Sequence, residues 1–369
     1  MSTGWKWVWG VVVVVVIVLA WSVYSKENRR TSSPESSMHV GAVLPLTGGL
    51  AFVGEDYKQG MELAAHEFGI NLVVQDGGAD PTESLNAARQ LEEAGVDVIL
   101  SAFRGASLSI GSSYGKNVEG PLIFATTATS NKQPIGDLGK NFFALGAEMI
   151  SAGEVIGSYA QDTCKSAATL TETTDAGLDK VAGFSQGLGE TKVVYGDTFS
   201  PDTTDFRTLI LKVKEAKADC LFIEVRSNAM VNFLKQIGEF EMDIPIYTNS
   251  YSVNADVVQQ SPSAQVEQVI FSSTKLYNQT TEQKKFFGAY RQEYGEEPND
   301  FAAVGYEMVR IIAEASKECG RDRECVREIL RNLDQESIVG PLVTDQYQEI
   351  KLTEYGLFGV KDGAFVTVQ

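Results

Sequence analysis

A Gly-x-Ser-x-Gly motif is the first feature of this sequence whose residue types could do chemistry. GFSQG spans residues 183–187, and in this pattern the serine attacks a carbonyl group while a histidine takes its proton. The reaction needs the serine directly after a strand and a histidine later in the chain. Ser185 lies within a helical pattern instead, and the two histidines, His39 and His66, both precede it. We therefore expect no enzyme activity and no catalytic residue.

The sequence also argues against a metal or a cofactor. The four cysteines form no CxxC pair and have no histidine near them, as a zinc site would require. No Walker A loop, no GxGxxG and no HExxH motif occurs. The carboxylates are scattered at helical spacing, which is typical of a solvated face. We expect neither a bound metal nor a cofactor.

Hydroxyl side chains at two places could instead bind a small anion. GAS at 105–107 and TTATS at 126–130 each follow a strand-like run. A carboxylate that loses its hydration needs hydroxyl and backbone N–H donors at helix N-termini. The alternative is that these hydroxyls only cap helices.

Arg226 is a further candidate for binding a carboxylate. It follows the run DCLFIEV, so it lies just past the C-terminal end of a predicted strand, where open parallel sheets bind ligands. Its guanidinium is a planar, permanently charged fork suited to a carboxylate. Ser250 and Tyr251, after the neighbouring predicted strand, could add hydroxyl donors. The alternative is that Arg226 only pairs with Glu224 or another surface acid.

The elements that must position these residues alternate along the chain from residue 39. Short β-rich runs alternate with amphipathic helical patterns, which predicts a parallel sheet with helices on both faces. The series restarts near residue 148, so we expect two doubly wound lobes joined by a multi-strand hinge, with a cleft between them. The expected boundaries are 39–145 and 270–335 for lobe 1, and 146–269 and 336–369 for lobe 2.

Composition fits a globular protein that does not bind nucleic acid. The chain has 369 residues, enough for two domains, with 43% hydrophobic residues. Its formal net charge of −18 leaves no basic stripe to neutralise phosphates.

The N-terminus reads as a separate segment. Residues 7–24 form an uncharged apolar run with tryptophans near both ends, long enough to cross a bilayer core. We interpret residues 1–25 as a retained membrane anchor, a transmembrane helix, and residues 26–38 as a flexible tether. The alternative is a cleaved signal peptide, which would release a secreted protein.

The cysteines predict a disulfide in an exported protein. Cys319 and Cys325 flank the charged turn GRDRE between two helical patterns, and we expect them to be bridged. A second bridge between Cys164 and Cys220 is an open alternative to two unpaired thiols.

Five stretches in the same order resemble the periplasmic binding proteins of the leucine/isoleucine/valine type, the substrate-binding subunits of branched-chain amino-acid ABC importers. The resemblance covers about 39–369 and implies the type I periplasmic binding fold. The stretches are VGAVLPLTGGLAFVGEDYKQGMELA, VVQDGGADPTESLNAARQL, PLIFATTATS, SPDTTDFRTLILKVKEAKADCLFI and PNDFAAVGYEMV.

The resemblance also implies site residues in the first lobe. In the family a serine and a threonine there bind the ligand carboxylate, which points to Ser107 and Thr129. An ungapped count places Ala106 at the serine position, and Thr127 is a rival to Thr129.

Other family contacts are replaced in this chain. The aromatic residue of the first loop falls on Val53, with Phe52 beside it. The aromatic and acidic contacts of the second lobe fall on Arg226 and Ser250. The pocket scaffold is thus expected to remain while its contacts change, so leucine itself is not the expected ligand.

These observations predict an extracytoplasmic solute-binding protein, at the cell surface or in the periplasm and attached to the cytoplasmic membrane. It would capture an amino acid or a related small carboxylate and deliver it to ABC transporter permease subunits. The alternative is a ligand-sensing ectodomain that acts through a separate signalling partner.

Overall fold

The computed structural model describes residues 37–78, 80–126, 135–147, 149–274, 280–352 and 354–368. Residues 1–37 and 38–369 are two separate units, and the described sheets and helices belong to the second. The predicted anchor, almost all of the predicted tether, Thr127 and Thr129 lie outside the described residues. Within the described ranges, none of the helices combines the length and apolarity needed to span a membrane.

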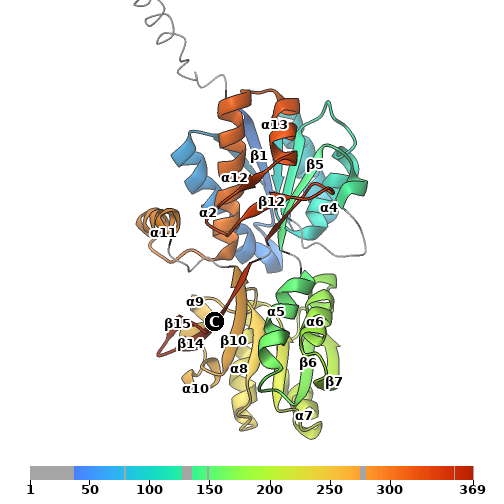
Figure 1. The fold of residues 1–369 in the computed structure, drawn as a ribbon, viewed down its shortest axis with the longest axis vertical. Helices are drawn as coiled ribbons and strands as arrows, with labels where there is room; N and C mark the ends of the chain where they lie inside the picture. Colours follow the sequence, from blue (N-terminus) through green and yellow to red (C-terminus); the bar gives the residue numbers. More distant parts are fainter. Residues whose placement is uncertain are drawn as a thin grey trace, which may run out of the picture. The chain divides into compact units, whose positions relative to one another are not determined.

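The described strands form two sheets, which confirms the predicted two-lobed α/β architecture (Figure 1). The first sheet has the order β11-β12-β13-β5-β4-β3-β1-β2. Its strands are β1 (His39–Leu44), β2 (Asn71–Asp76), β3 (Val98–Ser101), β4 (Leu122–Thr126), β5 (Phe142–Ala147), β11 (Asp334–Gln335), β12 (Leu342–Thr344) and β13 (Glu349–Leu352). We call this sheet and its helices the first lobe. The helices are η2 (Gly48–Leu50), α2 (Ala51–Phe68), α3 (Pro81–Glu93), α4 (Arg104–Tyr114), η3 (Ile135–Leu138), α11 (Thr281–Tyr294), α12 (Asp300–Cys319) and α13 (Arg323–Arg331).

The second sheet has the order β15-β14-β10-β9-β8-β6-β7. Its strands are β6 (Ser166–Glu172), β7 (Lys192–Phe199), β8 (Cys220–Glu224), β9 (Ile246–Asn249), β10 (Val269–Thr274), β14 (Tyr355–Lys361) and β15 (Ala364–Thr367). The second lobe is this sheet with α5 (Met149–Ala160), α6 (Asp175–Gly187), α7 (Arg207–Glu215), α8 (Ser227–Glu239), α9 (Ala255–Gln260) and α10 (Ser263–Val266). In both sheets the strands that alternate with helices pair in parallel.

Three successive pairs of described elements belong to different lobes: β5 and α5, β10 and α11, and β13 and β14. This differs from the predicted boundaries at two points. β10 was expected in lobe 1, but it pairs in parallel with β9 in the second sheet. β12 and β13 were expected in lobe 2, but β13 pairs in parallel with β5 in the first sheet. An apolar strand pattern predicts a strand without saying which sheet accepts it.

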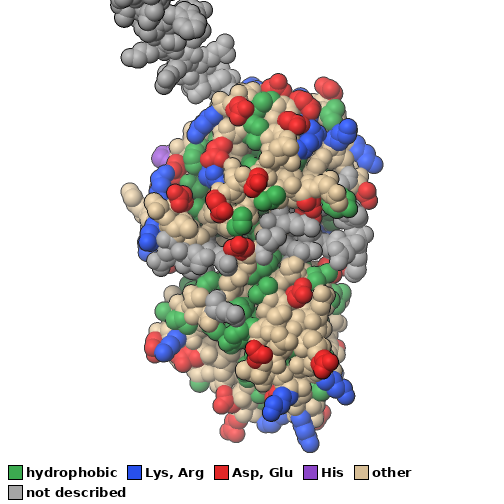
Figure 2. Space-filling model, viewed as in Figure 1, with side chains coloured by type: hydrophobic (Ala, Val, Ile, Leu, Met, Phe, Trp, Pro, Cys, Tyr) green, Lys and Arg blue, Asp and Glu red, His purple; other side chains and the backbone are tan. Residues whose placement is uncertain are grey.

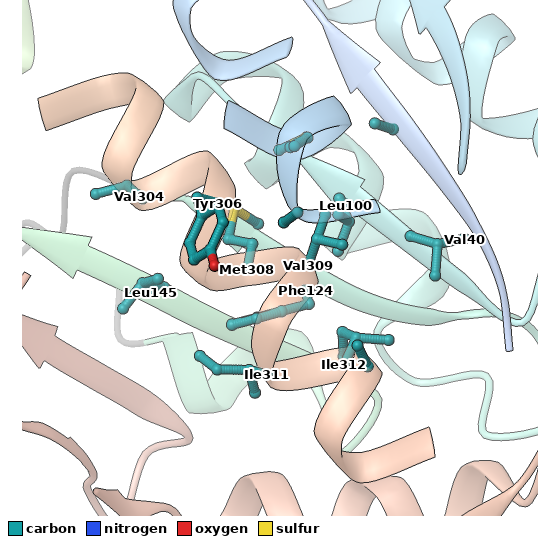
Figure 3. Close-up of a cluster of buried hydrophobic side chains, with 14 of the residues drawn as sticks. Val40, Leu100, Phe124, Leu145, Val304, Tyr306, Met308, Val309, Ile311 and Ile312 are labelled. Atoms are coloured by element: carbon teal, nitrogen blue, oxygen red, sulfur yellow. The ribbon is translucent and has the colours of Figure 1, made fainter. Parts of the chain in front are cut away.

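Side chains of the first sheet alternate between its two faces, and helices cover both faces. One face, with Val40, Leu100 and Phe124, packs against α2 and α12 (Figure 3). The opposite face, with Val43, Ile99 and Ile123, packs against α3 and α4. α12 contributes Val304, Tyr306, Met308, Val309, Ile311 and Ile312 to the first face.

In the second lobe, α5 and α6 pack closely through two matched pairs of glycines. A Cβ on Gly153 would lie 2.1 Å from the Lys180 carbonyl oxygen, and one on Gly183 would lie 2.0 Å from that of Ile150. Gly157 and Gly187 approach the facing helix just as closely. The GFSQG motif therefore serves helix packing: Gly183 and Gly187 face α5.

Two disulfides are present. Cys319 is bonded to Cys325 across the predicted turn, and Cys164 is bonded to Cys220, which joins the starts of β6 and β8.

Candidate ligand-binding site

The strand order of each sheet defines where a ligand can bind. β1 lies between β2 and β3 in the first sheet, and β6 lies between β7 and β8 in the second. At such switch points the connecting helices leave to opposite faces, and a crevice opens beyond the carboxyl ends of the strands. The residues that follow β1, β3, β6 and β8 are therefore the candidate site.

The first-lobe side is built around the start of α4. Phe103, directly before the helix, has a φ of 87°, a backbone conformation that is costly for a residue with a side chain and is found most often at functional sites. Phe103, Arg104 and Gly105 are partly exposed. The start of α4 thus presents these three residues to solvent.

Ser107 and Ala106 lie deeper in the first lobe. Ala106 is buried, and Ser107 is completely buried. The Ser107 hydroxyl donates to the Thr126 carbonyl oxygen at 2.9 Å and lies 3.1 Å from the Ser101 hydroxyl. In this structure Ser107 therefore ties β3, β4 and α4 together, and its predicted contact with a ligand stays a prediction.

Arg226 lies at the switch point of the second sheet, beside Glu172. Its backbone N–H donates to Glu172 Oε1 at 2.8 Å, and its Nε lies 3.7 Å from Glu172 Oε2. Glu172 is almost completely buried, and this burial raises its pKa even though Arg226 stabilises the charged form. The partner of Arg226 is thus neither Glu224 nor a surface acid. The Arg226 side chain itself remains 19% exposed.

Glu224 takes part in a second buried network. Lys180, on α6, donates to Glu224 Oε1 at 2.5 Å and to Asn249 Oδ1 at 3.2 Å. The Asn249 amide donates to the other Glu224 oxygen, and Lys180 Nζ lies 5.3 Å from the centroid of the Tyr251 ring. At this edge of the second sheet the negative charges of Glu172 and Glu224 thus equal the positive charges of Lys180 and Arg226. The edge is polar but formally neutral.

Two contacts connect this edge to the first lobe. Arg226 Nη1 lies so close to Gly49 that a Cβ there would be 2.6 Å away. The rings of Phe52 and Tyr251 have centroids 6.4 Å apart, and the Tyr251 side chain lies close to Arg226. The predicted residues Phe52, Arg226 and Tyr251 therefore lie together.

Ser250 is engaged with the first lobe as well. It lies close to Asp300, at the start of α12, which accepts hydrogen bonds from Ser273 and Thr274. Asp300 is fully buried, and this burial raises its pKa.

A cavity of about 800 Å³ opens beside Phe52 and Ser250. Its walls come from α2, α11 and α12 of the first lobe and from α9 and β10 of the second. Arg226, Glu172 and Tyr251 do not line this cavity, so the cavity and the polar edge around Arg226 are two neighbouring parts of the candidate site, which suits a small charged molecule. Within the described part of the site no histidine stands beside a hydroxyl or thiol nucleophile.

Glu172, Lys180, Asn249 and Asp56 were not predicted as site residues. Two of them carry a signal that sequence reasoning could have used, because each is the polar residue that ends a buried strand: SAATLTE ends on Glu172 and IYTN ends on Asn249. Asp56 carries no such signal, because it lies within the pattern of an ordinary amphipathic helix.

Comparison with known proteins finds a family and related sequences. The family model described as "Periplasmic binding protein" matches residues 37–364. Leu/Ile/Val-binding protein homolog 2 of Brucella abortus is 28% identical over 197 residues, which are 50% of this chain and 52% of that protein. The chain therefore spans about half the length of this relative in the match. Homolog 7 of the same organism is 24% identical over 339 residues, 83% of this chain and 84% of that protein.

Solved structures share the fold at lower identity. The branched-chain amino acid transporter substrate binding protein LivJ from Streptococcus pneumoniae, in complex with isoleucine, is 21% identical with a TM-score of 0.80, covering 90% of this chain and 99% of that one. A solute binding protein from R. palustris, in complex with benzoate, is 19% identical with a TM-score of 0.79, covering 90% and 95%.

Proposed function

This chain belongs to the periplasmic binding protein family, and on that premise we propose that it is an extracytoplasmic solute-binding protein that captures an amino acid or a related small carboxylate between its lobes. It would deliver this ligand to the permease of an ABC transporter and catalyse no reaction. The two bound relatives support the ligand class, because isoleucine and benzoate both carry a carboxylate.

One observation carries the proposal: Arg226 lies at the carboxyl edge of the second sheet and reaches Gly49 of the first lobe. A guanidinium at that position can bind a carboxylate with two parallel hydrogen bonds. A ligand held there would touch both lobes, and a ligand selects a closed state only by such differential contacts.

A thermal-shift screen of amino acids and small carboxylates tests this function. A ligand that binds only the folded state raises the melting temperature, by an amount that grows with its concentration relative to Kd. We expect at least one compound of this class to raise it. If no member of a broad panel shifts the melting temperature at millimolar concentration, the proposed function is wrong.

The apolar residues 7–24 support a further proposal, that the protein is attached to the cytoplasmic membrane through its N-terminus. The full chain should stay with membranes after high-salt and carbonate washes. Recovery of a mature chain that begins near Val23 or Lys26 would contradict it.

A further inference from the structure

The cavity beside Phe52 and Ser250 is strongly acidic. Carboxylates from both lobes line it, whereas the basic side chains among its described lining residues are Lys284 and Arg291. Arg291 is already paired with Glu297 at 3.0 Å, and Lys284 is exposed. The cavity therefore has an excess of negative charge. Its carboxylates are Glu55, Asp56, Asp256, Glu296, Glu297 and Asp300.

Asp56 is the carboxylate least compensated by its surroundings. Its Oδ2 accepts a hydrogen bond from Asn299 at 2.7 Å, and among the described residues it has no basic partner. Burial raises its pKa to about 6, and the nearby Glu296, Glu55 and Asp256 add to the rise. A partly buried carboxylate without a counterion favours a cation that arrives with a ligand.

Aromatic rings give the same cavity an apolar character. Phe52, Phe287 and Tyr290 line it from the first lobe, and Phe365 lines it from the second. Ring faces attract cations, and the rings also cover apolar stems. The combination of rings and an unpaired carboxylate is suited to an ammonium or guanidinium group on a hydrocarbon chain.

The cavity and the polar edge around Arg226 are adjacent at Phe52. Phe52 lines the cavity, and its ring centroid is 6.4 Å from that of Tyr251, whose side chain lies close to Arg226. We infer that the ligand is a basic amino acid: its carboxylate faces Arg226, and its side-chain cation lies beside Asp56 in the cavity. This inference rests on the proposed function and names its substrate class.

Calorimetric titration of the full chain at pH 7.5, in a mild detergent, tests the inference with lysine, arginine and leucine. Lysine or arginine should bind at least about tenfold more tightly than leucine, since only the basic side chains meet Asp56. Asp56→Asn should weaken that ligand about thirtyfold or more, as for a buried charge pair that loses one partner. Asp162→Asn, which removes the same charge from an exposed turn, should leave the affinity unchanged.

Cadaverine, which is lysine without its carboxylate, probes the cavity separately. It should bind more weakly than lysine and should depend on Asp56 in the same way. If Asp56→Asn fails to fold, as judged by circular dichroism, the preference of the wild-type chain among the three amino acids still decides the question.

The outcomes separate the two claims. Tight binding of leucine or benzoate, with no preference for lysine or arginine, would overturn the inference and leave the proposed function standing. Equal affinity of wild type and folded Asp56→Asn for the basic ligand would also overturn it. If none of the amino acids or carboxylates binds, the proposed function itself fails.

Discussion

Arg226 contacts both the first lobe and a buried acid of the second sheet. The Glu172 carboxylate accepts a hydrogen bond from the Arg226 backbone N–H and lies beside the Arg226 Nε. The Arg226 Nη1 lies against Gly49. Since the Nε is buried without a hydrogen-bond partner among the described residues, the guanidinium retains capacity to donate. This arrangement holds the arginine in place before a carboxylate arrives.

Replacing Arg226 with alanine should weaken a carboxylate ligand by about 2 kcal/mol, roughly thirtyfold, because the side chain is mostly buried. Titration calorimetry with the best ligand of the screen measures this change. Arg207→Ala is the matched control, since Arg207 pairs with Glu239 on the exposed surface. Unchanged affinity in Arg226→Ala would remove Arg226 from the site.

Asp56→Asn should change stability in a pH-dependent way. The pKa of Asp56 is raised on folding, so its contribution to stability is full below pH 3.8 and is lost as the pH rises to about 6. A shift of about 2 units corresponds to about 3 kcal/mol. Without ligand, Asp56→Asn should therefore be more stable than wild type at pH 7.5, by up to that amount, and the gain should shrink toward pH 4.

Denaturant unfolding of both proteins at several pH values measures this difference. Asp162→Asn serves as the control for the loss of one surface charge. A stability difference that stays constant between pH 4 and 7.5 would show that burial does not perturb Asp56.

At the residue scale, the sequence was a good guide to single positions that follow strands and a poor one to their partners. Arg226, Phe52 and Tyr251 were predicted and lie together. The partner Glu172 was missed because it is 54 residues away and the pairing depends on β6 lying beside β8. Asp56 was missed because only the tertiary fold shows that its helix faces a cavity.

At the scale of helices, α5 and α6 explain why a hydrolase-like motif occurs in a chain with no histidine after the motif's serine. Gly183 and Gly187 stand one turn apart, opposite Gly153 and Gly157. Ser185, between them, donates to the Val181 carbonyl oxygen within its own helix. The spacing of the motif coincides with that of two helix-packing glycines.

Gly183→Ala should destabilise the protein by about 1–3 kcal/mol or more, because its Cβ would overlap the Ile150 backbone and the helices would have to separate. Gly288→Ala is the control: Gly288 lies in α11 with no atom near its Cβ position, so alanine should be neutral or stabilise by about 0.5–1 kcal/mol. Thermal unfolding of both variants measures the contrast. Equal effects would mean that α5 and α6 pack less closely than described.

The sequence predicted the elements well because the hydrophobic periods of strands and helices differ. It did not predict which sheet receives β10 and β13, since both have ordinary strand patterns. That choice is made by neighbouring strands: Val269 pairs with Ile246, and Ile350 pairs with Leu145.

At the scale of the whole molecule, contacts between the lobes are concentrated around the site. Arg226 meets Gly49, Phe52 lies near Tyr251, and Asp300 accepts hydrogen bonds from Ser273 and Thr274. Binding of a ligand at these contacts is thus coupled to the orientation of one lobe relative to the other.

Ligand should bring the lobes together by rotation about the three connections between the sheets. Small-angle scattering should therefore give a smaller radius of gyration with the ligand than without it. Arg226→Ala, at the same ligand concentration, should stay close to the unliganded value. An identical radius with and without a ligand that calorimetry shows to be bound would argue against closure.

The first lobe is built from segments that lie far apart in the sequence. It therefore cannot be completed soon after its first strands have been synthesised. β1 to β5 are made early, but α12, which covers their inner face, and β13, which pairs with β5, come only after all the parallel strands of the second sheet. At 5–20 residues per second, the wait between β5 and α12 is roughly 10–30 s. A nascent chain stalled at residue 274 should therefore be rapidly cleaved by protease in its first lobe, whereas one that has released residue 352 should resist. The first lobe is thus begun first but is completed only after β6 to β10 of the second sheet have been made.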